Sequence, residues 1–286
     1  MLLACGDSNP SPSPSPSPSP SPSPSPSPSR PDWQKRVDDI PGTAVLTWVN
    51  GPVLMDGLIR VGSSAIGIAS LDPKTGKIVE QDKQAGSFIA KPTDPDVLYD
   101  DGSVRVTRQT VERLGKWTHD LDDTIDVGAS DPVVASGTLI MAIDRHLIGL
   151  HYLTGERVWE TDGFAHQPGT LRVLGGGKGL SAVALADGPG PVSVEPRTGE
   201  VLRTGDTVAA RMVLSAARSG GVLAMVVRRD REMLHDSVVA FDGLELRWEW
   251  NLPRPDGPRI DPIGVLIADD AVFVFYDGRY VVRLPL

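Results

Sequence analysis

The stretch His151-Tyr152-Leu153-Thr154-Gly155-Glu156-Arg157-Val158-Trp159 decides the fold of this 286-residue chain. An apolar strand leads into a Thr-Gly turn, and a tryptophan follows the turn. The Thr-Gly turn returns at Thr75-Gly76 and Thr198-Gly199, and degenerate copies place a glycine at Gly115 and Gly243. These turns recur at intervals of about 40 residues, which is the length of one four-stranded propeller blade.

The segments between the turns are typical of β-strands. Short apolar runs alternate with turn signals about every ten residues from Thr43 onward, and no amphipathic helix interrupts them. Asp269-Asp270 and Asp277-Gly278, for example, bracket the apolar run Ala271–Phe275. The pattern predicts an all-β chain folded as a single β-propeller of about six blades, with seven or eight left open. The predicted blades lie near 51–83, 84–123, 124–163, 164–207, 208–252 and 253–286.

The last of these units has no outer strand of its own. The apolar stretch Thr43–Asn50 lies before the first full repeat. We expect it to supply the missing strand of the last blade and so to close the ring.

The turns resemble the repeat of PQQ-like (quinoprotein-type) β-propellers, in which a strand ending in Leu-Asp is followed by x-x-Thr-Gly-x-x-x-Trp. The resemblance extends from about Gly51 to the C-terminus, although Trp is missing after Gly76 and after Gly199. Glycine permits the positive φ of a tight turn, and Trp is expected to fill the wedge between blades. The motif is therefore predicted to be structural and not to contact a ligand.

The same resemblance raises the question of whether the chain is an enzyme, because some members of the family are dehydrogenases. Quinoprotein dehydrogenases hold the quinone in the central funnel beside calcium, often with a vicinal Cys-Cys ring, and are much longer. This chain has a single cysteine, Cys5, and no recognisable cofactor platform. We therefore predict a non-catalytic protein with no catalytic residue, no cofactor and no metal site.

The N-terminal sequence Leu2-Leu3-Ala4-Cys5 resembles the lipobox of bacterial lipoproteins, so Cys5 is predicted to be the lipid attachment site. Leu3 is bulkier than usual at its position, and the charged and apolar regions of a signal peptide are missing upstream. Two interpretations stay open. Either Met1 lies inside a longer signal peptide and the chain is extracytoplasmic and anchored to the cell membrane, or the chain is cytoplasmic and Cys5 is accidental.

A nearly pure Ser-Pro alternation occupies residues 10–29. Alternating proline fixes φ and removes half of the amide donors, so the tract is predicted to be a disordered polyproline II spacer. At about 3.1 Å per residue it would reach on the order of 60 Å. A ligand for Pro-recognising domains or an O-glycosylated segment is the alternative. The chain thus divides into a lipobox remnant at 1–9, a stalk at 10–30 and a propeller domain at 31–286.

Composition excludes some classes of partner. The net charge of −9 and the pI near 5.0 argue against nucleic acid, because no basic cluster exceeds the pair Arg228-Arg229. The run Arg228–Glu232 is predicted to form a polar hairpin tip. Lys178 lies in a Gly-rich segment but lacks the spacing of a phosphate-binding loop, so a hairpin turn is predicted there.

Few other residues suggest a site. His119 with Asp120, Asp122 and Asp123 offers several oxygens to a hard cation, but a solvated acidic loop is the preferred interpretation. His146 and His151 are predicted to lie on opposite faces of one strand and not around one metal. Asp131 and Asp261, in matching Asp-Pro pairs, are interpreted as turn residues and not as ligands.

The anchor and the repeats together resemble the BamB-type envelope lipoproteins. We therefore expect an extracytoplasmic, lipid-anchored β-propeller that binds another envelope protein or acts as a scaffold. A small-molecule or sugar-binding envelope sensor is the alternative, and a quinone-dependent dehydrogenase is a third hypothesis. An exposed apolar patch would favour the first, and a pocket of converging polar and aromatic side chains would favour the second.

Overall fold

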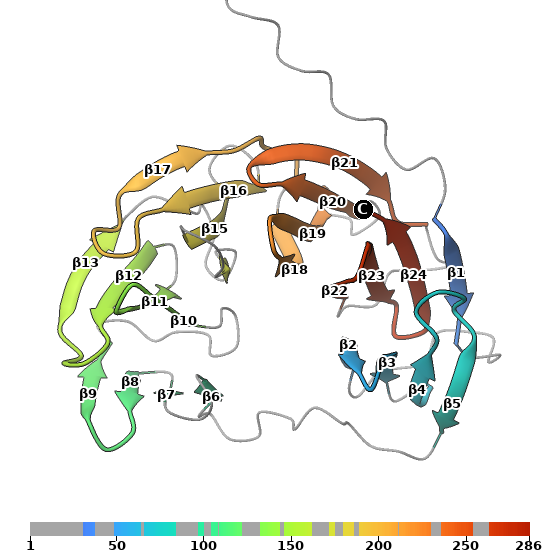
Figure 1. The fold of residues 1–286 in the computed structure, drawn as a ribbon, viewed down its shortest axis with the longest axis horizontal. Helices are drawn as coiled ribbons and strands as arrows, with labels where there is room; N and C mark the ends of the chain where they lie inside the picture. Colours follow the sequence, from blue (N-terminus) through green and yellow to red (C-terminus); the bar gives the residue numbers. More distant parts are fainter. Residues whose placement is uncertain are drawn as a thin grey trace, which may run out of the picture.

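The computed structural model describes residues 31–37, 49–63, 66–83, 97–99, 104–107, 109–121, 132–143, 146–161, 172–174, 180–185, 189–210, 212–229, 236–253 and 263–286. These residues form six four-stranded antiparallel sheets, which confirms the predicted all-β propeller of about six blades. The sheets are arranged around a common centre, each with one strand nearest that centre (Figure 1). Within the described residues, no helix is long and apolar enough to span a membrane.

The blades follow the chain in order, and within each blade the chain runs from the inner strand to the outer one. Blade 1 contains β2 (Val49–Met55), β3 (Leu58–Ser63), β4 (Gly67–Leu71) and β5 (Ile78–Asp82). Blade 2 contains β6 (Val97–Tyr99), β7 (Val104–Val106), β8 (Thr110–Arg113) and β9 (Trp117–Asp120). Blade 3 contains β10 (Val133–Ala135), β11 (Thr138–Ile143), β12 (His146–His151) and β13 (Arg157–Thr161).

The second half of the ring repeats this order, except that the outer strand of the last blade comes from the N-terminal end. Blade 4 contains β14 (Arg172–Leu174), β15 (Leu180–Leu185), β16 (Pro189–Val194) and β17 (Val201–Thr204). Blade 5 contains β18 (Met212–Ser219), β19 (Val222–Arg228), β20 (Asp236–Asp242) and β21 (Glu245–Asn251). Blade 6 contains β22 (Gly264–Ala268), β23 (Ala271–Tyr276), β24 (Tyr280–Pro285) and β1 (Trp33–Arg36).

Blade 6 takes this outer strand from a different segment than expected. β1 pairs antiparallel with β24, from Trp33↔Arg283 to Arg36↔Tyr280. The prediction that Thr43–Asn50 closes the ring is wrong, because Val49 and Asn50 begin β2 in blade 1, and 43–48 lie outside the described residues. Trp33 gives the physical reason: its ring packs against Phe273, 6.0 Å away between centroids, and its indole nitrogen donates to the Pro73 carbonyl at 3.2 Å.

The repeated Thr-Gly segments form the turns between the third and outer strands, as predicted. Gly155 has φ +76° and Gly199 has φ +74°, a backbone region that disfavours residues with a Cβ. In blade 1 the Asp72 carboxylate closes the turn, accepting bonds from the Thr75 amide and hydroxyl at 2.8 Å each and from the Lys74 amide at 3.0 Å. Gly76 thus allows the backbone conformation of this turn, and hydrogen bonds to Asp72 stabilise it.

The hydrogen bonds to the charged Asp72 carboxylate, first among them the one from the Thr75 hydroxyl, lower its pKa from the ordinary 3.8. A depressed pKa stabilises the folded state above the unfolded value, and this contribution is lost as the pH falls through the folded pKa. We expect Thr75→Val to raise the Asp72 pKa toward 3.8 in a ¹³C NMR titration. Lys74→Ala is the control, because the Lys74 charge is the smallest of the causes; an equal shift in both variants would contradict the prediction.

At three junctions, those of blades 6 and 1, 2 and 3, and 3 and 4, a tryptophan of one blade lies on the turn of the next. The Trp117 indole donates to the Tyr152 carbonyl at 3.0 Å, and the Trp159 indole donates to the Pro196 carbonyl at 2.9 Å. The same rings cover the turn glycines, Trp117 lying over Gly155 and Trp159 over Gly199. The predicted wedge role of the tryptophan is therefore confirmed, and its partner is the turn of the following blade.

Apolar cores between blades hold most of the ring together. Distinct buried clusters join blades 2 and 3, blades 3 and 4, blades 5 and 6, and blades 6 and 1. Blades 4 and 5 are joined by hydrogen bonds, since the Asp206 amide donates to the Leu244 carbonyl at 2.8 Å and the Leu246 amide donates to the Asp206 carboxylate at 2.7 Å. Burial of apolar area between sheets thus supplies most of the stabilisation of the ring.

The inner strands of blades 5, 6 and 1 lie close together near the centre. β22 lies beside both β18 and β2. At Gly264 the backbone of β22 reaches that of β2 so closely that an added Cβ would meet Gly51 and Pro52 at 2.6 Å. Glycine at this point is therefore needed for the two inner strands to approach each other.

Candidate functional site

Several residues singled out from the sequence lie outside the part of the chain that the structure describes. These are Cys5, Asp122, Asp123, Asp131, Lys178 and Asp261. The stalk at 10–29 and the Gly-rich segment around Lys178 also lie outside it. The lipid attachment at Cys5 and the turn at Lys178 therefore stay predictions.

Of the run Arg228–Glu232, predicted to be a polar hairpin tip, residues 230–232 lie outside the described residues, and Arg228 is part of a strand. Arg228 is the last residue of β19, directly opposite Asp236 of β20. Its guanidinium forms a two-pronged ion pair with that carboxylate, at 3.1 Å and 3.3 Å, and the two side chains are only 6% and 0% exposed. The prediction is wrong for Arg228 because β19 and β20 remain paired as far as Arg228 and Asp236. The carboxylate of Asp236 neutralises the buried charge of Arg228.

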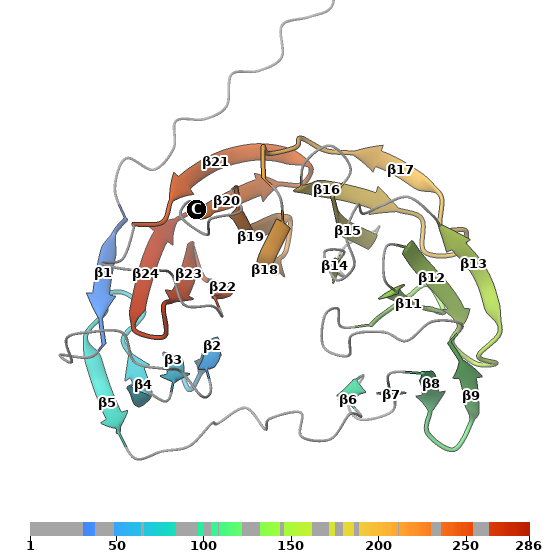
Figure 2. The same cartoon turned by 180° about the vertical axis from the view of Figure 1, so that it is seen from behind.

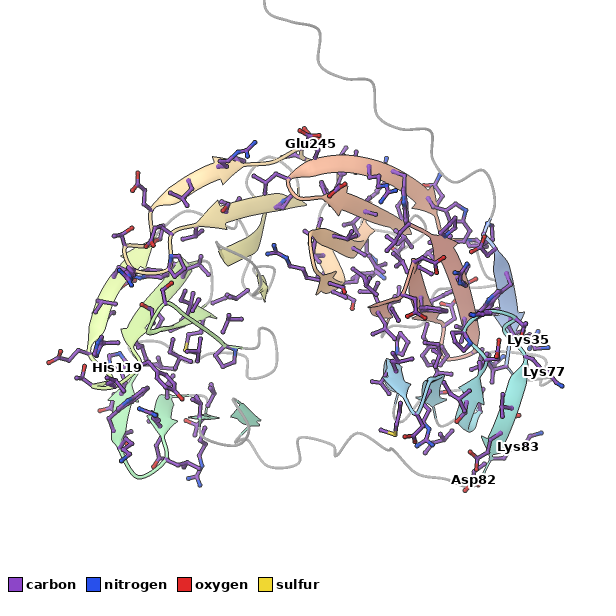
Figure 3. All side chains as sticks on the ribbon, viewed as in Figure 1. Lys35, Lys77, Asp82, Lys83, His119 and Glu245 are labelled. Atoms are coloured by element: carbon purple, nitrogen blue, oxygen red, sulfur yellow. The ribbon has the colours of Figure 1, made fainter. Side chains whose placement is uncertain are left out.

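Four polar side chains line a small hollow between blades 2 and 3. It is lined by His119, His146, Arg157 and Glu160 above Leu121, Ile143 and Ile148. Glu160 is central, because its carboxylate lies 2.9 Å from the Arg157 guanidinium and 3.3 Å from Nε2 of His146. His119 reaches the hollow from β9, on the outer rim of the ring (Figure 3).

The arrangement is a polar network centred on Glu160, which contacts both Arg157 and His146. Nowhere in the described residues do three or more His, Cys, Asp or Glu side chains gather closely enough to hold a metal ion. His146 and His151 do not share a site: His146 faces Glu160, whereas Nδ1 of His151 lies 3.0 Å from the Thr154 hydroxyl in the turn. Sequence reasoning missed that His119 and His146 line one hollow, because they lie on different blades.

A second hollow lies where blades 6 and 1 meet. Pro73, Lys74, Asp269, Asp270, Phe273 and Arg283 line it. The Arg283 guanidinium is engaged there by Asp270 at 2.6 Å and also by Asp32. The charge of Arg283 is therefore neutralised by carboxylates of the protein itself.

The outer rim of blades 3 and 4 exposes apolar side chains, which we call the rim patch: Val158 on β13 and Val201 and Leu202 on β17. Their exposed fractions are 48%, 42% and 49%. All four residues of β17 are exposed, and β17 is the outermost strand of its sheet. β13 and β17 follow each other along the rim in both views (Figures 1 and 2). Exposed apolar edge strands are usually avoided unless another chain covers them.

Three solved structures are similar to this chain, each with a TM-score below 0.5. The computationally designed protein Ika8 is 13% identical, with a TM-score of 0.47 over 83% of this chain and 71% of Ika8. BamB from Moraxella catarrhalis is 13% identical, with a TM-score of 0.37 over 80% of this chain and 82% of BamB. The Pan2 WD40 domain from Neurospora crassa is 10% identical, with a TM-score of 0.37 over 83% and 89%.

No family model matches the chain, and no curated protein matches its sequence. Because these TM-scores are below 0.5, the fold is assigned from the sheet topology of the chain itself. The chain is a β-propeller.

Proposed function

We propose that this propeller is a non-catalytic module of a PQQ-like, lipid-anchored envelope protein, and that it binds another envelope protein. The rim patch carries the proposal, because Val158, Val201 and Leu202 give a protein partner apolar area next to an open strand edge. A partner can extend the sheet beyond β17 by backbone hydrogen bonds while covering these side chains. This mode of binding requires no catalytic group and no cofactor.

The sequence of the N-terminus supports the cellular location. Cys5 follows Leu2-Leu3-Ala4 as in a lipobox, and the Ser-Pro tract begins shortly after it, at Pro10. A lipid anchor with a polyproline II stalk would hold the propeller at a distance from the membrane surface. The proposed site of the protein is therefore the extracytoplasmic face of a cell membrane.

One experiment tests both halves of the proposal. The chain is expressed from its full upstream reading frame, with a photo-cross-linking amino acid in place of Leu202, and with Cys5 intact or as Cys5→Ser. We expect a diacylglyceryl mass on Cys5, membrane fractionation that Cys5→Ser abolishes, and one defined envelope protein cross-linked through position 202. The same amino acid in place of Val79, which is 58% exposed on β5, is the control position.

The two halves fail separately. An unmodified chain in the soluble fraction would overturn the lipid anchor and the location. Cross-linking at position 202 that does not exceed cross-linking at position 79 would overturn the rim patch as a binding surface.

A further inference from the structure

The junction between blades 1 and 2 differs from the others. The six sheets form an arc that is interrupted between β2–β5 and β6–β9, as both views of the ribbon show (Figures 1 and 2). Within the described ranges, no apolar cluster contains residues of both blades. Blades 1 and 2 therefore face each other without the apolar core that joins most other pairs of neighbouring blades.

The flank of blade 1 explains the missing core. Arg60, Ser70 and Glu80 lie side by side across β3, β4 and β5. In blade 3 the same row is Ile140, Gly149 and Trp159, which packs against blade 4. Blade 1 thus has arginine in place of the core isoleucine and an exposed glutamate in place of the tryptophan. Asp82, at the end of β5, continues the charged row toward the interruption (Figure 3).

The opposing flank of blade 2 is also polar. Arg105, Glu112 and Thr118 form a row across β7, β8 and β9, and the Arg105 guanidinium lies 3.5 Å from the Glu112 carboxylate. The other row of this blade, with Val104, Val106 and Val111, is buried against blade 3.

The turn of blade 2, like the turn of blade 5 at Gly243, lacks the tryptophan that covers the turns of blades 1, 3 and 4. A Cβ added at Gly115 would meet nothing within 4 Å, whereas the turn glycines Gly76, Gly155 and Gly199 each lie under a tryptophan. Lys116 follows Gly115 in the same turn and is exposed.

We propose that blades 1 and 2 meet at a polar seam, at which the ring opens and closes. The seam consists of Arg60 and Glu80 on blade 1 and of Glu112 and Lys116 on blade 2. By the geometry of the blade 3–4 junction, closure brings Glu80 to the turn that carries Lys116 and brings Arg60 to Glu112. Ion pairs at such a solvent-accessible surface contribute little and are screened by salt, so the open and closed rings are close in free energy.

Spin-label distance measurements test the seam directly. In a Cys5→Ser background, labels at Val79→Cys and Leu114→Cys report the distance across the seam without replacing a seam residue. Labels at Val158→Cys and Thr198→Cys occupy the equivalent positions across the blade 3–4 junction and serve as the matched control. We expect two distances across the seam and one narrow distance across the control junction.

Salt and charge substitutions should change the distances measured across the seam but not those measured across the control junction. The ratio of long to short distances should rise about tenfold between low salt and about 1 M NaCl, where the screening length falls to about 3 Å. Glu80→Lys should favour the long distance at low salt, and Arg60→Ile with Glu80→Trp, which restores the residues of blade 3, should favour the short one. A single distance across the seam that neither salt nor Glu80→Lys changes, whether short or long, would overturn the proposal.

Discussion

Replacing Trp159 with alanine is expected to lower the free energy of unfolding by about 3–5 kcal/mol, the usual range for a large aromatic removed from a core. The side chain is 8% exposed and packs with Ile140 and Leu147 of blade 3 and with Val192 of blade 4. Its removal leaves a cavity between the blades and also breaks the hydrogen bond to the Pro196 carbonyl. Urea unfolding followed by far-UV circular dichroism measures the change without depending on tryptophan fluorescence.

Two further variants separate the parts of this effect. Trp159→Phe keeps most of the wedge and loses the indole hydrogen bond, so it should cost clearly less than Trp159→Ala. Val158→Ala, at the neighbouring exposed position of β13, should change stability by no more than about 0.5 kcal/mol. A loss of less than about 1 kcal/mol for Trp159→Ala would contradict the wedge role.

Asp236→Ala is expected to destabilise the protein by about 3–5 kcal/mol, because it leaves the Arg228 guanidinium buried without its carboxylate. Both side chains are almost fully buried, and the pair holds the ends of β19 and β20 together. Chemical denaturation of the variant, compared with the unchanged chain, measures the effect.

The double variant Arg228→Met with Asp236→Leu is the informative comparison. Removing both charges removes the desolvation cost, so the double variant should be much more stable than Asp236→Ala alone. Arg157→Ala, which breaks the partly exposed pair with Glu160, should cost only about 0–1 kcal/mol. If Asp236→Ala and Arg157→Ala lowered the free energy of unfolding equally, the buried ion pair would contribute no more to stability than the exposed one.

The sequence by itself determined the repeat and therefore the blades. Gly76, Gly155 and Gly199 mark turns that need a positive φ, and the alternation between them has the period of strands. Both signals are local, because a turn conformation and the two-residue periodicity of a strand depend on residues close together in the chain. Six blades could therefore be derived from the amino-acid sequence alone, close to the boundaries that the sheets have.

Only the tertiary structure decided which distant segments meet. Trp33 selects β1 to complete blade 6 by contacts with Phe273 and Pro73. The local sequence favours the apolar stretch at 43–50 instead, because three of the four residues at 33–36 are polar. The burial of Arg228, the meeting of His119 with His146 and the polar seam likewise depend on residues of different strands or blades. Periodicity says which face of a strand is apolar, but packing between sheets decides what that face touches.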